Sequence, residues 1–281
     1  VIDPDMAFVE TLPLARPTES GSMLLLLPRF VDAQGRIYFQ GMSMMGRGAA
    51  MPDSAYIARY DRGTEVVDTM GMVKLPESER SSAGGGNIRL GPRPMTPQDE
   101  WAVGPDGTAA VVRAADYSVD YYRPDGTFVD GPMNIVEPLS VGQAEKEEWV
   151  NGQGADGLAV MMSRSTTGVT NMQFSRGGMG FDSGGDDPTV DDYEFPDVLP
   201  VFRQGRVQVA PNGNTWVERW MQADSPPTFE IFDPQGIRVG TVELPVGRRL
   251  IGFGDGTIYV VRIDEVDLRW LERYRVVRSG D

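Results

Sequence analysis

The sequence contains no cysteine and no histidine among its 281 residues. Without cysteine it can form no disulfide, thiolate nucleophile, iron–sulfur cluster or covalently attached c-type haem. Without histidine it has no histidine-ligated metal, no Ser-His-Asp triad and no imidazole general base. Any chemistry would therefore rest on carboxylates, lysine, tyrosine, hydroxyl and backbone groups.

Basic residues and long apolar runs are also scarce. The chain has 26 Lys and Arg residues against 41 Asp and Glu residues, which gives a formal net charge of −15. Such a surface repels phosphate backbones and anionic lipid headgroups, so we expect a protein partner and no nucleic acid. The longest apolar run, Met23 to Pro28, is far shorter than the roughly 20 residues that span a bilayer.

Glycine and proline, by contrast, are abundant, with 34 and 21 residues. Four segments each place a tight turn between two apolar strands. Asp-Gly and Asn-Gly between alternating strands are strong hairpin signals, because Gly, Asn and Asp tolerate positive φ. The predicted first turns of the four segments contain Gly35, Gly107, Gly213 and Gly256, and three segments continue to two further strands through turns at Gly63, Gly126 and Gly236.

Antiparallel four-stranded units repeated in this way predict an all-β fold, a β-propeller of the six-bladed type, with the alternative that its N-terminal blades are missing from this chain. The spacing between Gly213 and Gly256 fits a blade of about 40–50 residues. We predict one domain, 1–281, with blades at 23–76, 100–136, 201–245 and 248–277. The interval 140–200 reads as irregular or as a degenerate blade, and Ser140 with Gln143 fits the capping box of a short helix.

The chain opens with VIDPDMAFVETLP, which is similar to IFDPQGIRVGTVELP at 231–245. We therefore predict that residues 1–14 form the outer strand of a blade. One alternative is that this strand completes the last unit, which has only three predicted strands and an open edge. The other alternative, which we favour slightly, is that it belongs to a blade upstream of Val1.

Several stretches carry a resemblance to a known family, among them LLLLPRFVDAQGRIYFQG, EWAVGPDGTAAVVRAADYSVDYYRPDG and GDGTIYVVRIDEVDLRWLERYRV. They resemble uncharacterised exported bacterial proteins with a six-bladed, NHL-like β-propeller. The resemblance covers most of the chain except roughly 151–197. It implies a signal peptide, upstream blades and an extracytoplasmic, periplasmic location, and it transfers no catalytic residue.

The acidic loop FDSGGDDPTVDDYEFPD, at 181–197, is the main candidate metal site. Oxygen ligands on a glycine-containing loop can hold Ca²⁺, although the spacing matches no EF-hand. The alternative is a solvated loop or one that docks on a basic partner. The candidate ligands are Asp182, Asp186, Asp187, Asp191 and Asp192.

Two functions remain open. The first is a non-catalytic extracytoplasmic propeller that acts as a scaffold and binds another protein through its long loops. In a more specific form of this hypothesis, the chain is an extrinsic subunit that stabilises a membrane-bound photosynthetic or respiratory complex. The second is a Ca²⁺-dependent, lactonase-like hydrolase with its site in the propeller channel. We favour the first, without cofactor, because no catalytic constellation stands out; the fold alone does not decide.

Overall fold

The computed structural model describes residues 23–44, 52–82, 88–156, 158–164, 170–176, 189–264 and 268–277. Within them the chain is mostly β, with four consecutive antiparallel sheets that we call blades 1 to 4. Blade 1 comprises β1 (Met23–Val31), β2 (Ile37–Met44), β3 (Ser54–Asp61) and β4 (Val66–Lys74); blade 2 comprises β7 (Glu100–Val103), β8 (Ala109–Val112), β9 (Val119–Tyr122) and β10 (Phe128–Val129). Blade 3 comprises β13 (Phe202–Val209), β14 (Thr215–Arg219), β15 (Thr228–Phe232) and β16 (Arg238–Glu243); blade 4 comprises β17 (Arg248–Gly254), β18 (Thr257–Ile263) and β19 (Arg269–Arg275).

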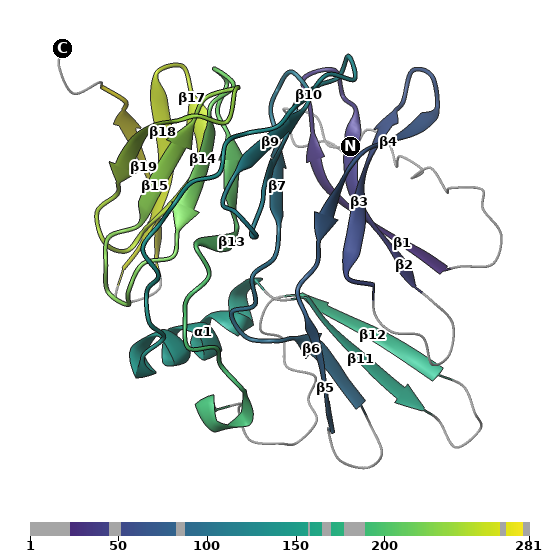
Figure 1. The fold of residues 1–281 in the computed structure, drawn as a ribbon, viewed down its shortest axis with the longest axis vertical. Coiled ribbons are helices and arrows are strands. Elements are labelled where there is room, and N and C mark those ends of the chain that lie inside the picture. The colour runs from purple at the N-terminus through teal and green to yellow at the C-terminus, as the bar shows by residue number, and fades with distance from the viewer. Residues whose placement is uncertain are drawn as a thin grey trace.

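The four blades lie side by side, from blade 1 on the right of Figure 1 to blade 4 on the left. In each blade the strands are paired in sequence order. Such four-stranded meanders, packed face to face in chain order, are the blades of a β-propeller. The predicted fold class is therefore confirmed. The N-terminal segment 1–14, which was predicted to form the outer strand of a blade, lies outside the described residues.

Apolar side chains fill each seam between neighbouring blades. Tyr38 and Ile57 of blade 1 pack with Trp101 and Val111 of blade 2, and Val111 is fully buried. Blade 2 is covered on both faces, which explains why all four residues of β8 are buried and why its sequence does not alternate. The blade 2–3 seam holds Val112, Tyr117, Val119, Val217 and Phe232, and the blade 3–4 seam holds Trp216, Phe229, Leu250, Ile258 and Val260.

The predicted hairpin turns are largely confirmed. Gly35, Gly107, Gly126, Gly213, Gly236 and Gly256 all have positive φ. The exception is the turn of β3 and β4, where Glu65 has the positive φ of 59° and Gly63 instead donates its backbone N–H to Asp61 Oδ1 at 2.8 Å. A bulge lies at Val239, because Ile231 pairs with Gly240 and Phe232 with Arg238, which leaves Val239 unpaired.

Two segments inserted between blades, one after blade 1 and the other at 140–200, form a fifth sheet, which the sequence did not predict. The first insertion contains β5 (Ser78–Ser82) and β6 (Ile88–Pro92), and the interval 140–200 contains β11 (Leu158–Arg164) and β12 (Thr170–Arg176). β11 pairs with both β6 and β12. In the described residues each insertion thus contributes two strands to this accessory sheet, which lies below blade 1 in Figure 1.

The predicted helix is α1 (Gln143–Asp156), but its cap differs from the prediction. Ser140 forms an isolated antiparallel bridge with Val198 instead of a capping box. Glu145 supplies the reciprocal bond, since its Oε2 accepts the N–H of Gly142 at 2.8 Å, while Oε1 accepts the N–H of Ala223 at 2.9 Å. Glu145 thus fastens the helix to blade 3. No helix in the described part of the chain is long and apolar enough to cross a membrane.

Candidate functional site

Three blades converge on one buried carboxylate, that of Glu100 at the start of β7. Its Oε1 accepts bonds from Arg29 Nη2 at 2.7 Å and from the Trp101 backbone N–H at 3.1 Å. Its Oε2 accepts the backbone N–H of Gly205 at 2.6 Å. Gln40 completes the group, because its Oε1 accepts bonds from both Arg29 Nη1 and Trp101 Nε1. Residues of blades 1, 2 and 3 therefore share one polar centre, which we call the Glu100 centre.

Local packing and backbone geometry hold the partners of this carboxylate in place. The Arg29 guanidinium lies 5.1 Å from the Trp101 ring centroid and 5.5 Å from that of Phe30, and these two rings contact each other edge to face, so the cation lies beside an aromatic pair. Gly205 lies in an irregular part of β13, with φ of 68°, and this bulge turns its N–H toward blade 2. Both carboxylate oxygens accept hydrogen bonds, and their donors come from three blades, so the centre joins the blades.

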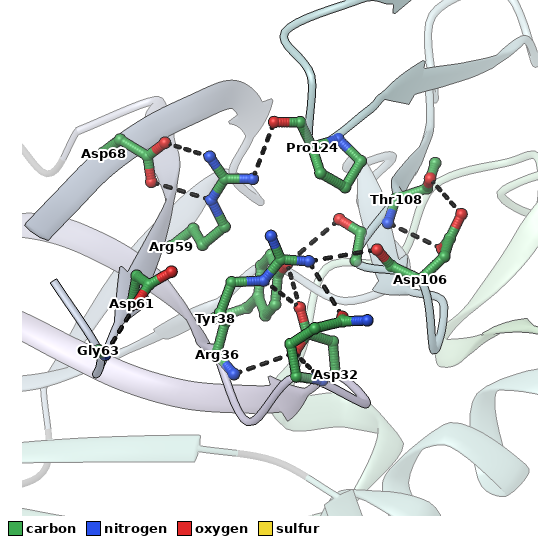
Figure 2. Close-up of polar contacts among 12 residues, drawn as sticks. Asp32, Arg36, Tyr38, Arg59, Asp61, Gly63, Asp68, Asp106, Thr108 and Pro124 are labelled. Carbon is green, nitrogen blue, oxygen red and sulfur yellow. Dashed lines mark hydrogen bonds and ion pairs between the residues drawn. The ribbon is translucent and has the colours of Figure 1, made fainter.

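A second polar group lies at the rim of the blade 1–2 seam (Figure 2). Arg36 Nε donates to Asp32 Oδ2 at 2.6 Å, and its Nη2 reaches the carbonyl oxygen of Asp106 on blade 2 at 3.2 Å. The buried Tyr38 hydroxyl donates to Asp32 Oδ2 at 2.8 Å and lies 3.2 Å from the carbonyl oxygen of Gly107. Gly107 must be glycine here, because a Cβ would meet Tyr38 and Arg36 side-chain atoms.

The ionisation of this rim group follows from burial and hydrogen bonding. Burial alone would raise the pKa of the Asp32 carboxyl, but hydrogen bonds from the backbone and side chain of Arg36 and from Tyr38 hold that pKa below its usual value. Burial, followed by the bond to Asp32, raises the pKa of the Tyr38 hydroxyl. Asp32 is therefore an anion and Tyr38 a neutral donor, which is a structural arrangement and not an acid–base pair.

An arginine–carboxylate pair recurs in blades 2, 3 and 4. In each blade the arginine lies six residues after the first turn glycine, on the second strand or just after it, and the acid is on the third strand. The distances are 2.6 Å for Arg113–Asp120, 3.0 Å for Arg219–Glu230 and 3.0 Å for Arg262–Glu272. The sequence carries the signal as Val-Val-Arg, Val-Glu-Arg and Val-Val-Arg, and it becomes visible only when the units are aligned on the turn glycine.

In the blade 2–3 seam the carboxylate of the Arg219–Glu230 pair accepts a hydrogen bond from a buried tyrosine. The Tyr117 hydroxyl donates to Glu230 Oε2 at 2.6 Å, and Glu230 Oε1 accepts bonds from Arg219 and Arg238 at 3.0 and 2.9 Å. Burial, with the bond to Glu230, raises the pKa of Tyr117 above its usual value. Nearby, burial raises the pKa of Tyr121 to about 12. These tyrosines remain protonated at neutral pH and act as seam donors.

Glu218 is a buried carboxylate whose contacts to two arginines are long. Arg203 Nε lies 3.6 Å and Arg206 Nε 3.9 Å from its oxygens, both too far for a good hydrogen bond. Burial therefore raises its pKa despite these arginines. Arg203 in turn pairs with Glu148 of α1 at 2.9 Å and lies over the Trp220 ring, whose buried Nε1 has no hydrogen-bond partner.

The sequence-predicted metal ligands do not come together in the described residues. Asp182, Asp186 and Asp187 lie outside them, while Asp191 and Asp192 lie in the short 3₁₀ helix Val190–Asp192, where Asp191 is exposed. Within the described ranges, no three acidic side chains are close enough to share an ion. The Ca²⁺ hypothesis thus remains a prediction for the loop as a whole.

An unpaired basic face lies on the side of blade 4 that points away from blade 3. Arg269, Leu271, Arg273 and Arg275 alternate along β19 on this side, while Glu272 and Tyr274 point back toward the blade 3–4 seam. In the part of the chain that the structure describes, no ion pair involves these three arginines. A cavity of about 450 Å³ lies at its end, lined by Asp255, Gly256, Thr257, Arg273 and Arg275.

Comparison with known proteins gives no assignment. No family model matches the chain, and no curated protein matches it. Among solved structures it is similar to a catalytically inactive virginiamycin B lyase from Staphylococcus aureus with quinupristin, at 10% identity and a TM-score of 0.22, covering 92% of this chain and 100% of that one. It is likewise similar to a streptogramin B lyase, at 10% identity and a TM-score of 0.22, covering 92% of this chain and 88% of that one. It is also similar to a luciferin-regenerating enzyme, at 11% identity and a TM-score of 0.20, covering 92% of this chain and 96% of that one. TM-scores of this size carry no argument, so the fold is inferred from this chain's own sheets.

Proposed function

We propose that this chain is a non-catalytic β-propeller that binds another protein and acts as a scaffold subunit outside the cytoplasm. The observation that carries the proposal is that donors from three blades bind both oxygens of the Glu100 carboxylate. In a propeller enzyme, side chains from several blades converge on the substrate; here the convergent carboxylate is used to join blades. A scaffold needs such rigid seams and an accessible outer surface.

The distribution of charge supports a protein partner. The chain carries a net charge of −15, yet its unpaired arginines gather beside the exposed Leu271 on the outer face of blade 4. Leu268, Trp270, Val276 and Val277 are also exposed on or beside β19, and a group of exposed apolar side chains rimmed by polar residues is typical of a protein-binding surface. In its more specific form, the partner belongs to a membrane-bound photosynthetic or respiratory complex, to which this subunit attaches from the periplasm.

The proposal is tested by tagging the full chain in its host bacterium, cross-linking in cells, and fractionating periplasm and membranes at low salt. A stoichiometric protein partner that co-purifies from the periplasmic or membrane fraction is the expected result. A chain that remains monomeric in every fraction would overturn the proposal. Hydrolysis of a panel of lactones that requires added Ca²⁺ and is abolished by a chelator would instead favour the hydrolase.

A further inference from the structure

We propose that the outer edge of blade 4 is a strand-addition site for an extended acidic segment of a partner protein. This inference rests on the proposed function, since it names the surface and the kind of partner. We call the alternating residues Arg269, Leu271, Arg273 and Arg275 of β19 the outer arginine face.

The backbone of β19 offers the first argument. Blades 1, 2 and 3 have four strands, whereas blade 4 has three in the described residues and ends at β19. β19 is seven residues long, contains no proline, and pairs with β18 without a register shift from Thr257–Arg275 to Ile263–Arg269. A regular edge strand of this length presents a row of free N–H and C=O groups on which another strand can pair. Within the described residues no strand pairs with the outer edge of β19, so the fourth position of this blade is open to an added strand.

The side chains of β19 define what that strand must carry. Arg248 and Arg262, on the other face of the blade, are neutralised by Glu272 at 3.2 and 3.0 Å. Within the described chain no carboxylate forms an ion pair with the outer arginines, although Asp255 lines the same cavity as Arg273 and Arg275. Because side chains on neighbouring strands of a sheet lie directly opposite one another, carboxylates at alternate positions of an added strand would pair with them. An acidic sequence is the complement of this face.

The apolar residues of the face favour a peptide over a nucleic acid. Leu271 is 68% exposed, and it lies opposite Val261 of β18. A phosphate backbone would leave this leucine uncovered and would be repelled by the net charge of −15. A strand with an apolar residue between acidic ones covers Leu271 and neutralises the arginines on either side of it.

The cavity beside β19 provides a site for one of these carboxylates. Arg273 and Arg275 line it together with the Thr257 hydroxyl, and Asp255 stands at its edge as the single acid among the lining residues. Its volume of about 450 Å³ exceeds the space that one carboxylate side chain fills. In strand addition, main-chain bonds give affinity and side-chain pockets give specificity. We therefore place an acidic side chain of the partner between Arg273 and Arg275.

The test uses the full chain and a blocked synthetic peptide that alternates glutamate and valine, with binding measured by calorimetry. We expect binding to the parent chain, and at least about tenfold weaker binding to the double variant Arg273→Glu/Arg275→Glu. Arg62→Glu, in the exposed turn after β3, is the matched control and should bind as the parent does. Hydrogen exchange should show protection of the β19 amides on binding.

Four further outcomes decide the matter. A peptide of the same sequence with N-methylated alternate amides should not bind; equal binding would show a purely electrostatic contact and overturn strand addition. Tighter binding of a single-stranded oligonucleotide than of the peptide would overturn the choice of partner. If the cellular partner is captured equally by the parent and the double variant, this site is wrong although the proposed function stands. If the peptide binds as expected but no partner is captured in cells, the proposed function fails and the site remains.

Discussion

Replacing Glu100 by glutamine tests whether this carboxylate joins the blades. The amide keeps the shape of the side chain but removes its charge, and it places an NH₂ group against one of the donors from Arg29 or Gly205. The Arg29 bond has a length of 2.7 Å and side-chain exposures of 28% for Arg29 and 6% for Glu100, so water compensates only the arginine. A hydrogen bond to a charged group contributes about 1.5–3 kcal/mol, and an unsatisfied donor adds a further cost. We expect Glu100→Gln to destabilise the fold by about 2–3 kcal/mol.

Urea unfolding followed by tryptophan fluorescence is a direct assay, because Trp101 is itself bonded to this group. Glu137→Gln, at an exposed position after blade 2, is the control and should change the free energy of unfolding by less than about 0.5 kcal/mol. A double-mutant cycle with Arg29→Met should give a coupling energy of about 1–2 kcal/mol. A cost for Glu100→Gln that equals the control, or a coupling of zero, would refute the role of the Glu100 centre.

Three other substitutions test the seams. In urea unfolding, Gly107→Ala should lower the free energy of unfolding by about 2–4 kcal/mol and Gly126→Ala by only about 1 kcal/mol. Both positions need positive φ, but only at Gly107 would the new Cβ displace neighbouring side chains. Tyr117→Phe should cost about 1.5–3 kcal/mol and Tyr121→Phe about 1, since only Tyr117 donates to a carboxylate; equal losses would contradict this. Burial raises the pKa of Glu218 in the folded state above its pKa in the unfolded chain. Ionisation of this carboxyl therefore destabilises the fold as the pH rises above the unfolded pKa. Glu218→Gln should thus stabilise the protein at about pH 7 and lose this advantage near pH 4. Urea midpoints across this range that shift equally at every pH would contradict the assignment.

The blades could be predicted because their signals are local. A turn glycine and the apolar residues on both sides of it specify one hairpin, so positions such as Gly107 and Gly213 located the first strand pairs correctly. The error at Gly63 has a local cause as well: Asp61 accepts N–H bonds from Gly63 and Thr64, which moves the left-handed residue to Glu65. Glycine is the residue that most readily adopts positive φ, but the hydrogen bonds to the Asp61 side chain determine which residue of this turn adopts it.

The accessory sheet and the Glu100 centre could not be predicted in the same way, because their contacts are non-local. β6 pairs with β11 across the whole of blade 2 and the helix α1. Neither insertion alone carries a hairpin turn motif that indicates this partner. Likewise, Glu100 reads in the sequence as one more surface acid before a strand. Only packing of β1, β7 and β13 brings Arg29 and Gly205 to its two oxygens.

The arginine pairs of the other strands set the outer arginine face apart. A carboxylate on the third strand neutralises the arginine that follows the turn in blades 2, 3 and 4, so these pairs link strands within a blade. Arg269, Arg273 and Arg275 differ, since no carboxylate of the described chain forms an ion pair with them. On a chain of net charge −15, three such arginines lie together beside the exposed Leu271. That arrangement is understandable if the missing carboxylates come from another protein, and it is the reason for assigning recognition to the edge of blade 4.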